Sequence, residues 1–230
     1  MKKLMLSLVL IALTGTMFAD QTKTDATDRL DSSAKVLKQI NAAPDKGIPQ
    51  EVMDGAKCVA VVPRLIKGAF IIGGKHGRGV ATCRLPNGKW SAPAFFSISG
   101  GSWGAQIGAE SVDLVMMIMN DNGMRHLLSN KFQIGGEAAA AAGPVGRHAA
   151  AGTDWKLDSQ ILTYSRAHGA FAGVSLDGSW IEKDDDSTEA FYGKQLTNEA
   201  LLEGKVTPPA AANPFLAAVK TSKAVANKRG

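Results

Sequence analysis

The chain contains few of the residues from which catalytic and metal centres are built, and these shortages limit what it can do. Among its 230 residues are 2 cysteines, 4 histidines and 2 tyrosines, and aromatic residues make up only 6%. The histidines lack the spacing of a metal site, and the cysteines form no C-x-x-C pair. We therefore expect no catalytic residue, no metal site and no cofactor.

Acidic residues are missing from one long stretch of the chain. No Asp or Glu occurs between Gly55 and Ala109. The same stretch contains seven cations: Lys57, Arg64, Lys67, Lys75, Arg78, Arg84 and Lys89. Acidic residues gather instead in residues 182–189, and the tail is basic again. Such an asymmetry predicts an anionic partner and is no argument about fold.

These seven cations are the candidate lipid-binding residues. Each Lys or Arg near an anionic bilayer contributes about 1 kcal/mol, so four or five together would give reversible, salt-sensitive binding. Lys67, Lys75 and Arg78 fall at or beside predicted turns, where their charged ends could cluster. The alternative is that the charges scatter around the protein, because alternate residues of a strand face opposite ways. Charge alone leaves both open, and we expect no nucleic-acid partner.

The first 19 residues have the pattern of a signal peptide. Lys2 and Lys3 precede an apolar run over residues 4–13, and Ala19 is a small residue at a cleavage point. The run is too short for a membrane span. We expect an exported protein, periplasmic in a Gram-negative cell, that is at most peripheral on a membrane. Residues 20–26 are expected to form a flexible N-terminus of the mature chain.

The remaining pattern predicts one α+β domain over residues 27–203, with a curved antiparallel sheet, partial barrel or sandwich and helices at both ends. Helices are expected at 27–41, 49–54, 122–130, 187–195 and 197–202. Strands are expected at 58–62, 69–72, 80–85, 94–98, 111–119, 161–165, 170–176 and 180–181. Residues 204–230 form a basic C-terminal segment, with a helix expected from Asn213 and Pro214.

Several short motifs suggest chemistry but are better explained by structure. Ser102 in GGSWG fits the G-x-S-x-G pattern of a nucleophile elbow, yet strand-like sequence follows it where the elbow needs a helix. We expect a structural glycine turn there, and a hairpin turn at GGKHGRG, residues 73–79. The methionines at 116, 117 and 119 are expected in the core. The acidic run 184–186 is expected to be a solvated loop.

Cys58 and Cys83 can be paired or free, and two arguments oppose each other. An even count in an exported protein favours a disulfide. If residues 58–63, 69–74 and 79–85 form a three-stranded meander, the cysteines lie on its outer strands, about 10 Å apart at 4.8 Å per strand. That exceeds the roughly 7 Å limit for a bridge. A crossing to another sheet layer would bring them together, and we favour the disulfide.

Several blocks in order resemble the SYLF domain family, among them GAFIIGGKHGRGVA, SAPAFFSISGGSWGAQIG and YSRAHGAFAGVSLDGSWI. The resemblance identifies the chain as an exported bacterial member. It implies lipid binding, with actin regulation in eukaryotic members, and makes GGSWG part of a family glycine turn ending at Gln106 and Gly108. It supplies no catalytic residues.

Two functions follow as hypotheses. The first is a non-enzymatic module that docks on anionic phospholipid head groups in the cell envelope. The second is a structural or protein-interaction factor that binds an acidic envelope protein or polysaccharide.

Overall fold

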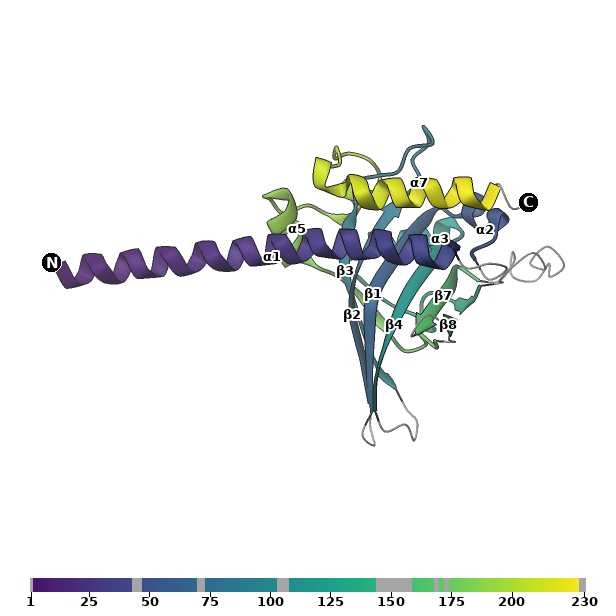
Figure 1. The fold of residues 1–230 in the computed structure, drawn as a ribbon, viewed down its shortest axis with the longest axis horizontal. Helices are drawn as coiled ribbons and strands as arrows, with labels where there is room; N and C mark the ends of the chain where they lie inside the picture. Colours follow the sequence, from purple (N-terminus) through teal and green to yellow (C-terminus); the bar gives the residue numbers. More distant parts are fainter. Residues whose placement is uncertain are drawn as a thin grey trace.

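A curved sheet of nine strands organises the chain in the computed structural model (Figure 1). The structure describes residues 2–42, 47–69, 73–102, 108–143, 159–167, 170–171 and 174–227. The strands are β1 (Cys58–Ala69), β2 (Gly73–Cys83), β3 (Ala94–Ser102), β4 (Gly108–Ile118), β5 (Lys131–Gln133), β6 (Ala140–Ala142), β7 (Ile161–Ala167), β8 (Ala170–Phe171) and β9 (Trp180–Lys183). Their order is β5-β9-β3-β2-β1-β4-β7-β6, with β8 paired to β7. Only β6 and β7 pair in parallel, so the expected α+β fold with an antiparallel sheet is confirmed with that exception.

Helices cover both faces of the sheet. They are α1 (Lys2–Ala42), α2 (Gln50–Gly55), α3 (Asp121–Leu128), α5 (Asp185–Tyr192), α6 (Asn198–Leu202) and α7 (Asn213–Asn227), with a 3-10 turn η2 (Ala210–Ala212). Helices α1 and α7 lie side by side across one face (Figure 1). Helices α3 and α6 contribute buried leucines to the core on the other face. Strands β1 to β4 extend beyond the helices as a long twisted ribbon (Figure 1).

Two core layers lie on opposite faces of the sheet, and strand β4 belongs to both. Val115 and Met117 face the layer formed with α1 and α7. Leu114 and Met116 face the layer formed with α3 and α6. All four side chains are buried. A strand covered on both faces reads as a continuous apolar run, which explains why the sequence predicts this element and the role of its methionines correctly.

The three-stranded meander considered above is not formed, because the described residues between 58 and 83 belong mainly to two long strands, β1 and β2. Residues 70–72, most of the expected strand 69–72, lie outside the described residues. Strand β1 continues through a bulge near Arg64, and GGKHGRG begins strand β2 instead of forming a turn. A Cβ atom at Gly77 would lie 2.6 Å from the Val62 side chain, and one at Gly79 would lie 2.4 Å from the Phe96 ring. These glycines therefore leave room for large neighbours on the buried face of the sheet.

The disulfide between Cys58 and Cys83 is confirmed. Because β1 and β2 are direct neighbours, the two residues lie opposite each other in the antiparallel register. Their Cα atoms are 4.0 Å apart and their sulfur atoms are bonded. Both side chains are fully buried. The bond closes the base of the β1–β2 hairpin, at the end nearest α2.

Helix α1 begins earlier than the sequence predicts. Residues 20–26, expected to be flexible, lie within the helix. Ala26 is fully buried and starts an apolar stripe that continues through Leu30, Ala34 and Leu37. This stripe packs on the sheet and on α7, which explains the longer helix. Within the part of the chain that the structure describes, no helix has the length and apolar character needed to span a bilayer.

The GGSWG motif does not form the expected turn at its start. Gly100, Gly101 and Ser102 are the last residues of strand β3 and pair with β2. Trp103, Gly104 and Gln106 lie outside the described residues. The next described element is strand β4, beginning at Gly108, whereas a nucleophile elbow needs a helix behind its serine.

Candidate functional site

Of the three cations that the sequence places at turns, the structure separates Arg78 from Lys67 and Lys75. Lys67 on β1 and Lys75 on β2 are register partners, so they share one face of the sheet. Arg78 lies on the other face, because it alternates along β2 with the buried residues Gly77 and Gly79. All three lie within strands, so the predicted turn cluster is wrong.

Lys67 and Lys75 do not present free charges on a surface. Lys75 is only 6% exposed, and its Nζ donates a hydrogen bond of 2.9 Å to the carbonyl oxygen of Ser175. Burial lowers the pKa of the Lys75 ammonium group. Gly100 allows this packing, since a Cβ atom there would lie 3.0 Å from Lys75 Cε. Lys67 Nζ is 3.5 Å from the carboxylate of Glu110 on β4.

Lys57 lies beside Arg84, whose backbone N–H donates to the Lys57 carbonyl oxygen at 2.7 Å, whereas Arg64 lies further along β1. Lys57 precedes β1, and its Nζ is 3.2 Å from Asp121 on α3. Arg64 occupies the bulge of β1 with φ 65°, and its backbone N–H donates to Asp113 on β4. Both side chains are exposed.

A hairpin turn brings Arg84 and Lys89 together. They flank the predicted Asn87-Gly88 hairpin turn, which is confirmed by Gly88 at φ 78°. The Leu85 N–H donates to the Lys89 carbonyl oxygen at 2.8 Å, which closes the turn. The turn also places Trp90 beside Arg84 as a bridge partner.

The Arg84 guanidinium is held in a fixed position. Its Nη2 donates to the Met53 carbonyl oxygen at 2.8 Å, and its Nε donates to the Ala56 carbonyl oxygen at 3.3 Å. These carbonyls lie at the end of α2, where a cation is favoured. Arg84 Cζ lies 4.8 Å from the centre of the Trp90 ring, a cation–π distance. Arg84 therefore fixes the orientation of Trp90.

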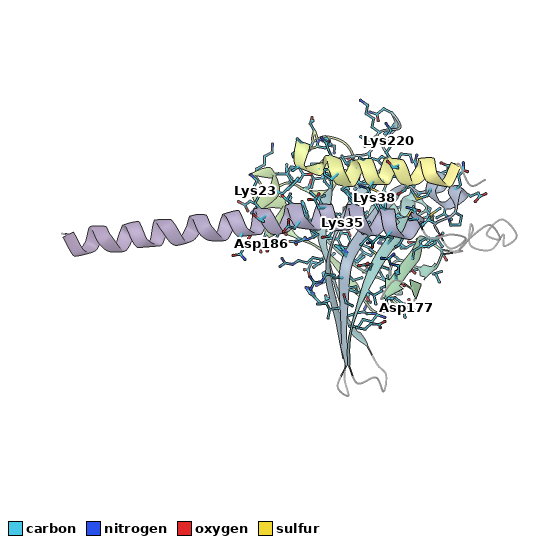
Figure 2. The ribbon with its side chains drawn as sticks, in the orientation of Figure 1. Lys23, Lys35, Lys38, Asp177, Asp186 and Lys220 are labelled. Atoms are coloured by element: carbon cyan, nitrogen blue, oxygen red, sulfur yellow. A yellow bond between two sulfur atoms is a disulfide. The ribbon has the colours of Figure 1, made fainter. Side chains whose placement is uncertain are left out.

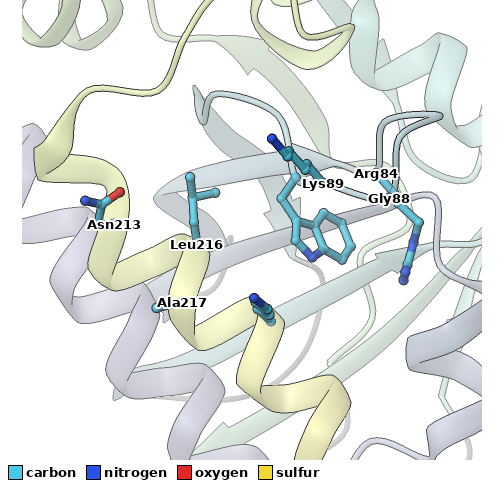
Figure 3. Close-up of a pocket in the computed structure, with 8 residues that line it drawn as sticks. Arg84, Gly88, Lys89, Asn213, Leu216 and Ala217 are labelled. Atoms are coloured by element: carbon cyan, nitrogen blue, oxygen red, sulfur yellow. The ribbon is translucent and has the colours of Figure 1, made fainter.

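Helix α7 completes a pocket around Trp90, which we call the Trp90 pocket (Figure 3). Its volume is about 470 Å³, and it is lined by Arg84, Gly88, Lys89, Trp90, Asn213, Leu216, Ala217 and Lys220. Trp90 and Leu216 are half-buried and pack against the core layer of α1 and α7. Three of the lining residues are cations and none is acidic. Sequence reasoning identified neither Trp90 nor Lys220 as a site residue, although residues 213, 216, 217 and 220 have helical spacing.

The helices beside this pocket carry exposed lysines with few acidic neighbours. Lys35 and Lys38 are exposed on α1, and Lys220 is exposed on α7 (Figure 2). Helix α7 contains no acidic residue, and α1 contains none after Asp31. Helix α2, which packs on α7, carries two exposed acids, Glu51 and Asp54. We call these three lysines, together with the exposed Lys89 on the neighbouring hairpin, the basic helix layer.

A buried ion pair ties α1 to the remainder of the domain. Arg29 on α1 donates to Asp184 Oδ2 at 3.0 Å and to Ser187 Oγ at 3.1 Å. Asp184 also caps α5, accepting the Ser187 N–H at 3.0 Å. Burial raises the pKa of Asp184, but the hydrogen bonds from Ser187 and the charge of Arg29 outweigh it, so the net pKa is lowered. The expectation of a solvated loop at residues 184–186 is thus wrong: the Asp184 side chain is buried as the cap of α5, and Asp185 and Asp186 are exposed residues in the first turn of that helix.

Fold and pocket together define the class: an α+β domain with a curved sheet and a cationic surface pocket. Among the described residues, no three His, Cys, Asp or Glu side chains gather as metal ligands would. Residues 99–222, just over half of the chain, match the family model described as "Ysc84: Las17-binding protein actin regulator". The chain belongs to this family, which confirms the SYLF resemblance.

Relatives from yeast and mammals support this assignment. The chain is 34% identical over 193 residues to Protein YSC84 of Saccharomyces cerevisiae, covering 80% of this chain and 41% of that protein. It is 33% identical over 186 residues to human SH3 domain-containing YSC84-like protein 1, covering 78% and 54%. LAS seventeen-binding protein 3 of S. cerevisiae is 32% identical over 174 residues, covering 74% and 38%. The chain thus spans about half or less of the length of these relatives.

Proposed function

We propose that this chain is a non-enzymatic lipid-binding module that docks reversibly on anionic phospholipid head groups in the cell envelope. The observation that carries the proposal is the basic helix layer. Its four lysines are exposed. Helix α7 and the part of α1 that follows Asp31 contain no acidic residue, so these segments provide no carboxylate to neutralise the lysines. Export, predicted from residues 1–19, would bring this surface to the envelope.

The number of charges sets the expected strength of binding. Four lysines at about 1 kcal/mol each correspond to about 4 kcal/mol, or a dissociation constant on the order of 1 mM. Contacts of this kind are screened by salt, since the Debye length falls from about 10 Å at 0.1 M to about 3 Å at 1 M. Binding through these lysines alone is therefore weak and reversible.

Vesicle sedimentation tests the proposal. The purified protein should pellet with vesicles of phosphatidylglycerol and phosphatidylcholine at low salt, less at 0.5 M salt, and not with phosphatidylcholine alone. The double variant Lys38→Glu/Lys220→Glu should lose most of this binding. The matched control Arg125→Glu/Lys131→Glu changes net charge equally, at exposed positions on α3 and β5, and should pellet like wild type. Equal pelleting of both variants would exclude the basic helix layer as the contact surface.

A protein-interaction module is the second candidate function. It is favoured by the family description, which refers to Las17 binding and actin regulation, and by the name of one relative, LAS seventeen-binding protein 3. Sedimentation with filamentous actin, in the buffer used for vesicles, tests this candidate. Pelleting with actin but not with anionic vesicles would replace the lipid proposal by this one.

A further inference from the structure

We propose that the Trp90 pocket holds one anionic phospholipid molecule, with its phosphate among Arg84, Lys89 and Lys220 and the first part of an acyl chain against Trp90 and Leu216. This inference rests on the proposed function, because it names the place where a single lipid of the docked surface is recognised. The volume of the Trp90 pocket, about 470 Å³, lies within the usual range for sites that bind small molecules.

The cations of the pocket suit a phosphate. Arg84 is already immobilised by Met53 and Ala56, and these contacts use two of the five N–H donors of its guanidinium. A charged group held in place before binding loses little conformational entropy when the ligand arrives. Lys89 on the hairpin and Lys220 on α7 are both exposed, and both line the pocket. Within the described chain, neither forms a recorded ion pair.

The apolar part of the pocket distinguishes an amphiphile from a free anion. Trp90 and Leu216 remain half-exposed although both are packed on the core layer beneath them. Burial of apolar surface contributes about 25 cal/mol per Å², so a ligand that covers both side chains gains affinity that inorganic phosphate cannot. With no acidic lining residue, a zwitterionic or cationic head group finds no partner for its positive charge.

Titration calorimetry with short-chain lipids, kept below their micelle concentration, tests the inference. Dihexanoylphosphatidylglycerol should bind the full protein saturably with one site. Dihexanoylphosphatidylcholine, with the same chains, and glycerol 3-phosphate, which lacks them, should each bind at least tenfold more weakly. Equal binding of glycerol 3-phosphate would mean a simple anion site. Binding of an acidic, aromatic peptide in place of the lipid would also overturn the proposal.

Two variants locate the binding. Lys220→Glu should weaken the binding of dihexanoylphosphatidylglycerol tenfold or more. Leu216→Asn should weaken it by a similar factor, because it removes an apolar side chain from the pocket. Arg125→Glu on α3 is the matched charge control and should bind like wild type. Far-UV circular dichroism and a thermal melt establish that each variant is folded. If both pocket variants bind the lipid like wild type, the site lies elsewhere and the inference is wrong.

The pocket and the docking surface can fail separately. Lys38→Glu alone should reduce vesicle pelleting but leave dihexanoylphosphatidylglycerol binding unchanged, because Lys38 does not line the pocket. Vesicle pelleting that depends on Lys38, together with no binding of the short-chain lipid, would refute the pocket and leave the proposed function standing. Saturable short-chain binding by a protein that never pellets with vesicles would contradict the proposed function instead.

Discussion

Replacing Asp184 by alanine should destabilise the domain strongly, because it removes one member of a buried ion pair. The side chains of Arg29 and Asp184 are 6% and 9% exposed, and their contact is 3.0 Å. Without Asp184, the Arg29 guanidinium stays buried, with the Phe95 ring centre 5.4 Å from its Cζ. Among the described residues, the Ser187 hydroxyl then remains as its hydrogen-bond partner. Helix α5 also loses its N-terminal cap.

The expected loss in the free energy of unfolding is about 3 to 5 kcal/mol. This is the usual cost of leaving one charge of a buried pair unpaired. The lost cap, typically worth about 1 kcal/mol, acts through the same carboxylate and is not simply added. For a chain of this size, each kcal/mol lowers the melting temperature by about 2 to 4 °C, so a fall of about 10 °C is expected.

The lowered pKa of the Asp184 carboxylate makes the stability of the folded protein depend on pH. The pKa of Asp184 is lowered in the folded state, so its contribution is fully present above the unfolded value of about 3.9 and is lost as pH falls through the folded value. Wild type should therefore lose this part of its stability below about pH 4. Asp184→Ala should lack that part of the acid dependence.

Urea unfolding followed by far-UV circular dichroism, at pH 7 and pH 3, measures these effects. Asp186→Ala is the matched control, because Asp186 is exposed in the same turn of α5 and should change stability by less than 1 kcal/mol. The double variant Arg29→Met/Asp184→Ala removes the stranded charge and should recover part of the loss. A loss below 1 kcal/mol for Asp184→Ala at pH 7 would refute the view that this pair fixes α1 to the domain.

Two further predictions concern the disulfide and a buried lysine. Reducing the Cys58–Cys83 bond should lower the free energy of unfolding by about 3 kcal/mol, which is the chain-entropy value for a loop of this length. Urea unfolding with and without dithiothreitol measures this loss. A change under 1 kcal/mol would contradict the prediction. Lys75→Met should leave pelleting with anionic vesicles unchanged, because the Lys75 amine is buried against Ser175, and a loss of pelleting in a folded variant would return Lys75 to the binding surface.

Sequence periodicity predicts the elements whose environment repeats along the chain. Strand β4 reads as a continuous apolar run because both of its faces are buried, and the start of α7 is marked by Asn213 and Pro214. The first half of strand β2, residues 73–79, is taken for a turn because its glycines are required by Val62 and Phe96, which belong to other strands, whereas the expected strand 80–85 covers the second half. A glycine that makes room for a distant side chain looks the same in a sequence as one that forms a turn.

The Trp90 pocket is beyond sequence reasoning for a related reason. Its hairpin side comes from residues 84–90 and its helix side from residues 213–220, far apart in the sequence, and they meet because α7 packs beside α1 over the sheet (Figure 1). Local pattern did identify the Asn87-Gly88 turn and the apolar residues of α7. Local sequence pattern does not predict the contact between this turn and α7, nor the hydrogen bonds from Arg84 to the carbonyl oxygens at the end of α2.

The acid-free stretch of sequence has a different meaning once it is folded. Three of its seven cations pair with carboxylates contributed by chain segments outside the stretch: Lys57 with Asp121, Lys67 with Glu110, and Arg78 with Asp184 at 3.9 Å. Arg64 is exposed, and it is its backbone N–H that donates to Asp113. Lys75 is buried against a carbonyl oxygen. Arg84 and Lys89 alone reach a pocket without acidic lining, where Lys220 from α7 joins them. Charge counted along the chain therefore overstates the binding surface, because an excess of positive charge persists only where folding brings cations together and leaves carboxylates out.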